Sequence, residues 1–245
     1  MGVLLETRGI SKTFGGVQAL DRIDLSVERG EVLGVIGPNG AGKTTLFNVI
    51  CGLKPTAGRV LFKDEDITGH RPHEICRRGL SRTFQLTRPF GEISVQDNVA
   101  AAVLFGRNQT RGASLAEARR RADLLLARVR LDQRKGALAK DLRFSERRRL
   151  ELARALATSP DLLLLDEVMA GLTVAEAGEM VEILGRLKQE FALTLLVIEH
   201  VMKVVMTISD RIVVLNYGTK LTEGAPHEVA AHRDVIDAYL GVEHA

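Results

Sequence analysis

The chain has 245 residues, of which 45% are hydrophobic and 27% are charged, with a formal net charge of +3 at pH 7. This length is enough for the core of one α/β domain, and so small a positive net charge is only weak evidence for a nucleic-acid or lipid partner. No apolar run approaches the ~18–20 residues that cross a bilayer, the first residues lack the pattern of a signal segment, and Cys51 and Cys76 lack metal-ligand or redox spacing. We therefore expect a soluble, cytosolic protein.

The first predicted elements are antiparallel strands, because apolar and polar residues alternate through Val27. A continuous apolar run follows at 32–36, and similar runs occupy 162–165 and 194–198. Uninterrupted apolar runs of this length are typical of parallel strands that are buried on both faces. The sequence therefore predicts an α/β fold in which an antiparallel β subdomain precedes a core with a parallel sheet.

A glycine-rich loop directly follows the run at 32–36. It consists of Gly37, Pro38, Asn39, Gly40, Ala41, Gly42, Lys43, Thr44 and Thr45. Its glycines let backbone N–H groups wrap around a phosphate, and the helix that begins near Gly42 points its positive dipole end at the same anion. Lys43 is placed to reach the outer phosphates, and Thr44 to offer its hydroxyl to the Mg²⁺ that arrives with the nucleotide. In this setting we expect a nucleoside triphosphate site and not a glycine-rich turn without a ligand.

The stretch between this loop and the run at 162–165 is predicted to be mostly helical. Ser114 and Glu117 have the spacing of a capping box, and an apolar stripe follows them. We place a helical insertion subdomain approximately at 86–158, inside a single domain that spans 1–245.

Polar side chains end the two later apolar runs. Because ligands of open α/β sheets bind at the C-terminal ends of the strands, Asp166 is placed to hold Mg²⁺ through water. Glu167 is then the natural general base for the water that attacks the phosphate. His200 follows the run at 194–198. An Asp-Glu pair alone often lies in a solvated loop, but together with the phosphate loop it indicates hydrolysis of the nucleotide.

With these motifs, the whole chain resembles the ATP-binding subunits of ABC transporters. The resemblance implies the P-loop ATPase fold, with ATP and Mg²⁺ as cofactors. It further implies that Phe14 stacks on adenine, that Gln85 touches Mg²⁺ and the attacking water, and that His200 contacts the γ-phosphate. Taken without the resemblance, Phe14 is as well explained as a core residue, Gln85 as a surface residue and His200 as a structural histidine.

Residues 142–146 depart from the pattern of this family. They align with its Leu-Ser-Gly-Gly-Gln signature, which binds the γ-phosphate of ATP on the opposite subunit through a serine hydroxyl and glycine N–H groups at a helix N-terminus. Arg143 replaces that serine, and Ser145 replaces the second glycine. Ser145 keeps a backbone N–H and Arg143 is cationic, so an altered phosphate site and a weakened one both remain open.

Residues 170–173 resemble the loop that crosses the dimer interface in the same family. Thr173 stands where the family usually has an acidic or amide residue. Thr173 and Glu176 also have the spacing of a capping box, so a helix is predicted to begin there.

Four stretches resemble the branched-chain amino acid importers, and among them the larger of the two ATP-binding subunits. These stretches are residues 82–85, 165–172, 198–200 and 235–241. This resemblance implies that ATP hydrolysis powers import through separate transmembrane permease subunits, which residues 86–92 would contact. It also implies a second ATP-binding subunit in a homodimer or heterodimer, an extracytoplasmic solute-binding protein as an indirect partner, and a peripheral place on the cytoplasmic face of the plasma (inner) membrane.

Other functions compete with this interpretation. The closely similar urea and amide importers are an alternative, because such a subunit does not touch the transported solute. A catalytically weak nucleotide-binding subunit is a second alternative because of Arg143 and Ser145, although Glu167 and His200 argue against it. A DNA-repair or chromosome ATPase needs a long coiled-coil insertion after the phosphate loop, and a translation-associated ABC protein normally has two such loops. We therefore expect no nucleic-acid partner.

Overall fold

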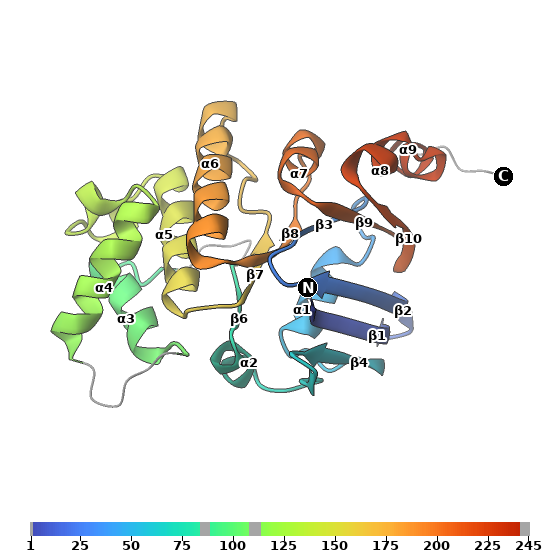
Figure 1. Ribbon diagram of the computed structural model, residues 1–245, viewed down its shortest axis with the longest axis horizontal. Helices are drawn as coiled ribbons and strands as arrows, with labels where there is room; N and C mark the ends of the chain where they lie inside the picture. Colours follow the sequence, from blue (N-terminus) through green and yellow to red (C-terminus); the bar gives the residue numbers. More distant parts are fainter. Residues whose placement is uncertain (1, 84–88, 108–113, 241–245) are drawn as a thin grey trace. The chain divides into compact units, whose positions relative to one another are not determined.

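The computed structural model describes residues 2–83, 89–107 and 114–240. It divides into two compact units, which we call the first unit (Met1–Ile75 with Thr194–Ala245) and the second unit (Cys76–Leu193). Figure 1 shows their helices and strands along the chain. Both ends of the sequence belong to the first unit, and the whole second unit comes from the middle of the chain.

An antiparallel sheet opens the first unit. Its strands β1 (Val3–Phe14), β2 (Val17–Glu28), β4 (Ala57–Phe62) and β5 (Glu65–Asp66) are ordered β2-β1-β4-β5. In β2 the alternating residues Ile23, Leu25 and Val27 are buried, which is why apolar and polar residues alternate there. The predicted antiparallel β subdomain is thereby confirmed.

A second sheet in the first unit is mostly parallel. Its neighbouring strands are β10 (Thr219–Gly224), β9 (Arg211–Asn216), β3 (Val32–Ile36) and β8 (Thr194–Ile198). Strand β3 pairs in parallel with both β8 and β9, and β10 pairs antiparallel with β9. Every residue of β3 and β8 is buried, as the apolar runs predict.

Short helices complete the first unit. They are α1 (Lys43–Ile50), α7 (Met202–Ile208), α8 (Pro226–Ala231) and α9 (Arg233–Leu240), and α2 (Pro72–Arg78) contains the boundary to the second unit. Val229 of α8 and Val235 of α9 are buried in one cluster with Ile36, Ile212 and Val214. The last helices are therefore part of the core that supports the end of β3.

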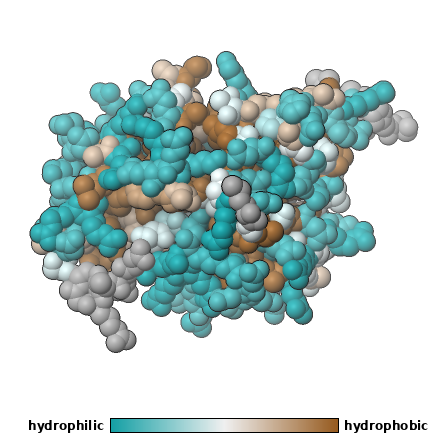
Figure 2. All heavy atoms as spheres, in the orientation of Figure 1, coloured by the Kyte–Doolittle hydropathy of each residue, from teal (hydrophilic) through white to brown (hydrophobic). Residues whose placement is uncertain are grey.

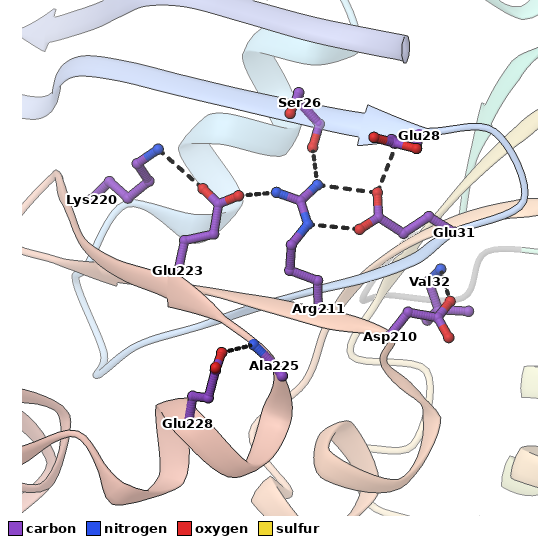
Figure 3. Close-up of polar contacts among 10 residues, drawn as sticks. All are labelled: Ser26, Glu28, Glu31, Val32, Asp210, Arg211, Lys220, Glu223, Ala225 and Glu228. Carbon is purple, nitrogen blue, oxygen red and sulfur yellow. Dashed lines mark hydrogen bonds and ion pairs between the residues drawn. The ribbon is translucent and has the colours of Figure 1, made fainter. Parts of the chain in front are cut away.

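Arg211, the first residue of β9, ties both sheets of the first unit together (Figure 3). Its guanidinium donates to Glu31 at 2.7 and 3.1 Å, to the carbonyl of Ser26 at 2.7 Å, and to Glu223. Arg211 and Glu31 are 24% and 11% exposed, so the pair is screened less than a surface pair. Val32, the first residue of β3, donates its N–H to Asp210 at 2.8 Å. These contacts fix the start of β3 against chain segments that follow much later.

The second unit combines two parallel strands with a group of helices. Strands β6 (Leu80–Arg82) and β7 (Leu162–Asp166) pair in parallel. The helices are α3 (Val95–Phe105), α4 (Leu115–Arg128), α5 (Phe144–Ala157) and α6 (Val174–Phe191), with short 3₁₀ turns at Asp132–Arg134 and Ala139–Asp141. Helices α3, α4 and α5 pack on one another. The helical character of the predicted insertion is confirmed. Its limits at 86–158, and the interpretation of the chain as a single domain, stay predictions.

Two helices of the second unit begin where the sequence predicts. Ser114 caps α4 by accepting the N–H of Glu117 at 3.2 Å. Thr173 caps α6 by accepting the N–H of Glu176 at 3.3 Å, and Glu176 accepts the N–H of Thr173 at 2.9 Å. These reciprocal bonds satisfy donors that every helix start leaves open.

Hydrophilic side chains cover most of the face drawn in Figure 2, and hydrophobic side chains show only in smaller groups between them. In the part of the chain that the structure describes, none of the helices combines the length and the apolar content that a membrane span requires.

Candidate functional site

The phosphate loop begins where β3 ends, and its glycines are required by the backbone. A Cβ on Gly37 would lie 2.1 Å from the carbonyl oxygen of Leu215, and one on Gly42 would lie 2.7 Å from that of Ala19. Gly40 has a φ of 82° and open space around it. Only glycine fits the two close approaches, and the left-handed backbone at Gly40 also favours glycine. The tight curvature predicted for a phosphate-binding loop is therefore present.

Lys43 is the first residue of α1 and is held against this loop. Its Nζ donates to the carbonyl oxygens of Gly37 at 2.6 Å and Pro38 at 2.9 Å, and the side chain is buried. The first turn of α1 contains no acidic residue. The helix dipole and the lysine charge therefore both favour an anion at this helix start. Thr44 is exposed, so its hydroxyl can reach a ligand.

His200 leaves the sheet at the same edge as the phosphate loop. Strands β3 and β8 are parallel neighbours, with Val35 paired to Ile198, so the residues that follow each strand emerge side by side. His200 is exposed there. The structure thus brings two predicted parts of the site, the phosphate loop and His200, to one edge of the first unit.

Phe14 is the last residue of β1 and is 47% exposed, so it is not a core residue. The ammonium of Lys12 lies 4.9 Å from the centre of its ring. An exposed ring with a cation beside it can stack on a nucleobase, and adenine stacking stays a prediction for Phe14.

Asp166 ends β7 and is almost fully buried. Its Oδ2 accepts a hydrogen bond from Arg82 at 2.5 Å, and its backbone N–H donates to the hydroxyl of Thr83 at 3.1 Å. Its Oδ1 is buried and has no hydrogen-bond partner among the described residues. A buried carboxylate oxygen without a donor is costly unless it binds a ligand, so this atom fits the predicted role of holding Mg²⁺ through water.

Glu167 follows with an unusual backbone. Its φ is 50°, in the left-handed region that residues with a side chain rarely adopt, and only 7% of the residue is exposed. Such strain is concentrated at functional sites, where the surrounding structure holds a side chain in one direction. This conformation is compatible with the predicted base.

The two substituted signature residues differ in their surroundings. Arg143 precedes α5 and is exposed, and its N–H donates to Glu146 at 2.8 Å. Ser145 is 7% exposed, and its side chain is hydrogen-bonded to the carboxylate of Glu176. The hydroxyl of Ser145 therefore serves an internal contact between α5 and α6, and only Arg143 presents its side chain to solvent. Phosphate binding by either residue stays a prediction.

Some of the predicted site residues are not among those that the structure describes, and sequence analysis missed one residue of the site. Gln85 and residues 86–88 lie outside the described residues. Sequence reasoning did not identify Arg82 as the partner of Asp166, although it lies only three positions before Gln85. A basic residue within an otherwise buried strand end was the signal that could have found it, because buried charges are paired.

Comparison with known proteins gives a consistent result. The family model "ABC transporter" matches residues 20–170, and the model "Branched-chain amino acid ATP-binding cassette transporter" matches residues 219–245. The high-affinity branched-chain amino acid transport ATP-binding protein LivG of Escherichia coli (strain K12) is 40% identical, covering 97% of this chain and 98% of that protein. BraF of Pseudomonas aeruginosa, described in the same words, shows the same identity and coverage.

Solved structures agree with the sequence matches. The ADP conformation of an ATP-binding cassette of an ABC transporter has a TM-score of 0.88 and 31% identity, covering 98% of this chain and all of the other. A dimeric structure of a bacterial ABC transporter cassette has a TM-score of 0.82 and 26% identity, covering 91% of this chain and 99% of the other.

Proposed function

This chain belongs to the ABC transporter family, and on that premise we propose that it is the ATP-hydrolysing subunit that powers import of branched-chain amino acids through separate permease subunits. The observation that carries the proposal is the match of residues 219–245 to a model specific for branched-chain amino acid transporters, beside relatives with that transport in their names. Urea and amide importers are not favoured, because the matched model and these relatives are described for branched-chain amino acid transport.

The chain is an ABC-type ATPase with an α/β fold and binds ATP. We propose that Thr44 and Asp166 hold a Mg²⁺ ion, which would supply positive charge to the phosphates. The exposed hydroxyl of Thr44 and the unpartnered buried oxygen of Asp166 support this assignment. Gln85 is proposed as a further contact to the ion.

Each remaining site residue has a proposed chemical role. Lys43 and the N–H groups of the loop bind the phosphates, and Phe14 stacks on the adenine. Glu167 takes a proton from the attacking water, and His200 contacts the γ-phosphate. Arg143 and Ser145 act on ATP of the opposite subunit.

An ATP-binding subunit of this family works with membrane permease subunits and as a dimer, which the dimeric cassette structure illustrates for a relative. We propose that the partner cassette is either a second copy or a related chain, and that an extracytoplasmic solute-binding protein acts indirectly. The chain would then associate peripherally with the cytoplasmic face of the membrane.

Two substitutions test the chemistry. Lys43→Ala should abolish tight ATP binding, because the phosphates lose a positive charge next to them. Glu167→Gln should still bind ATP but hydrolyse it slowly and accumulate as an ATP-bound dimer, because only the general base is lost. Equilibrium binding of ATP, phosphate release and size-exclusion chromatography with ATP measure the three properties. Hydrolysis by the Gln variant at the wild-type rate would show that Glu167 is not the base.

Uptake assays test the transported solute. A strain that lacks this gene should lose most uptake of labelled leucine, isoleucine and valine. The wild-type gene should restore it, and the Glu167→Gln gene should not. Urea and amide uptake in the same strains is the control. Unchanged branched-chain amino acid uptake together with loss of urea or amide uptake would contradict the proposal.

A further inference from the structure

Tyr239 links the last helix of the described chain to the start of the phosphate loop. Its hydroxyl accepts the backbone N–H of Gly37 at 2.8 Å. Tyr239 lies on α9, which is anchored to the first unit because Val235, one turn earlier, is buried in the cluster that includes Ile36. A side chain 202 positions away in sequence therefore contacts the first residue of the loop.

Gly37 is held from three directions. Its N–H is bound by Tyr239, its carbonyl oxygen accepts Nζ of Lys43 at 2.6 Å, and its α-carbon is packed so closely on the carbonyl of Leu215 that a Cβ would not fit. Burial raises the pKa of Tyr239 above its ordinary value of 10.0, so the phenol stays neutral. One of these three contacts is the hydrogen bond from Lys43, whose ammonium group the phosphates also attract.

We propose that Tyr239 is a positioning residue for nucleotide binding, whose hydroxyl fixes the first peptide of the phosphate loop so that the affinity for ATP depends on the docked helix α9. The N–H of Gly37 is used by the tyrosine, so this group is not among those that bind the phosphates. Because the start of the loop is already ordered before the nucleotide binds, less conformational entropy is lost on binding. This role rests on the proposed function, in which the loop binds ATP.

A merely structural role for the hydroxyl predicts something different. If it only satisfied a partly buried N–H, its removal would lower stability and leave nucleotide affinity unchanged. A positioning role changes the dissociation constant and KM for ATP, with little change in kcat at saturation, because the loop holds the phosphates equally in the ground and transition states. The two roles are therefore separable by one conservative substitution.

Tyr239→Phe in the full chain keeps the ring and removes only the acceptor. We expect its dissociation constant and KM for ATP to rise about twofold to tenfold, the effect of one neutral hydrogen bond, while kcat stays close to wild type. Tyr217→Phe is the matched control, because Tyr217 is 83% exposed, and it should bind ATP as the wild type does. Equal affinity of wild type and Tyr239→Phe would overturn the proposal. Failure of the wild type itself to bind ATP would instead overturn the proposed function.

Tyrosine emission provides a second test with Tyr239 left intact. The chain has two tyrosines and no tryptophan, so Tyr239 is the sole emitter in the Tyr217→Phe variant. Mg²⁺ with inorganic triphosphate carries the phosphates of ATP without the absorption of adenine. We expect a saturable change in emission, because phosphates draw the ammonium of Lys43 from the carbonyl of Gly37 and so change the electrostatic environment of the Tyr239 hydroxyl, which stays on the N–H of that residue. The Lys43→Ala, Tyr217→Phe double variant should lose this change. Constant emission while competition with ATP shows that triphosphate binds would contradict the proposal.

Discussion

Asp166 and Arg82 form a buried ion pair in the second unit, with side chains that are 2% and 8% exposed. The arginine gives the carboxylate a counter-charge at one oxygen, while the other oxygen has no partner among the described residues. A charge in such surroundings is costly without compensation, so each member of the pair depends on the other. Arg82 therefore gives Asp166 a charged partner at one oxygen and leaves the other oxygen for a ligand.

Replacing Arg82 should affect stability far more than replacing an exposed arginine. We expect Arg82→Met to lower the free energy of unfolding by about 3–5 kcal/mol, because Asp166 is left buried and unpaired. Urea unfolding at pH 7 measures the loss. The control is Arg107→Met, which removes the half-exposed pair with Asp161 and should cost about 0–1 kcal/mol. Similar losses in both variants would contradict the assignment of Arg82 and Asp166 as a dependent buried pair.

At the scale of elements, the starts of α5 and α6 are joined by one carboxylate. Glu176 accepts the N–H and the hydroxyl of Thr173, both at 2.9 Å, and is hydrogen-bonded to Ser145 at the start of α5. The signature segment and the loop at 170–173 therefore share a polar partner within the second unit. A substitution that moves either segment therefore alters the hydrogen bonds of Glu176.

The hydrogen bonds of the Glu176 carboxylate should make the free energy of unfolding depend on pH in the acid range. Hydrogen bonds from the Thr173 backbone and then Ser145 lower the pKa of Glu176 below 4.5, so the ionised carboxylate is the form that stabilises the fold. Its contribution is complete above the unfolded pKa and is lost as the pH falls through the folded pKa. Wild type should therefore be more stable than Glu176→Gln at pH 7, and the difference should shrink as the pH falls below 4.5.

Urea unfolding of both proteins over a pH series measures this effect. Thr173→Ala is a useful second variant, because it removes one partner of the carboxylate and one helix cap, and it should cost about 1 kcal/mol. A difference between wild type and Glu176→Gln that does not vary with pH would contradict the assignment.

At the scale of the whole molecule, each unit carries one cysteine. Cys51 follows α1 in the first unit, and Cys76 begins the second unit, with its Sγ 3.7 Å from the hydroxyl of Ser81. Both thiols are half-buried, so a labelling reagent reports how often each region opens. The two residues are thus natural probes of the two units.

ATP should protect Cys51 more strongly than Cys76. Cys51 directly follows the helix that Lys43 begins. A ligand that binds only the folded loop makes opening of that region rarer, by about a hundredfold at a concentration of 100 times the dissociation constant. Labelling rates of the single-cysteine variants Cys51→Ser and Cys76→Ser, with and without ATP, measure this. Lys43→Ala should remove the protection. Equal slowing at both thiols would show that the two units open together.

Local patterns account for the parts of the molecule that the sequence predicts. The buried runs, the glycine loop and the capping boxes at Ser114 and Thr173 each depend on residues within a few positions of one another. The contacts that were missed join distant positions, such as Tyr239 with Gly37 and Arg82 with Asp166, and no periodicity marks such pairs. The hydrogen bond of Ser145 to Glu176 was missed for the same reason, although both helix starts were expected.

The central position of β3, between two strands that come late in the sequence, has a consequence for the synthesis of the protein. Both of its edges are occupied by strands, β8 and β9, that lie near the other end of the chain. A ribosome releases β3 and the glycine loop early, yet their neighbours emerge only after the whole second unit has been translated. Until then β3 lacks the two strands that pair with it, and the loop lacks the carbonyl of Leu215 and the hydroxyl of Tyr239. A nascent chain is thereby kept from engaging ATP until its synthesis is nearly complete.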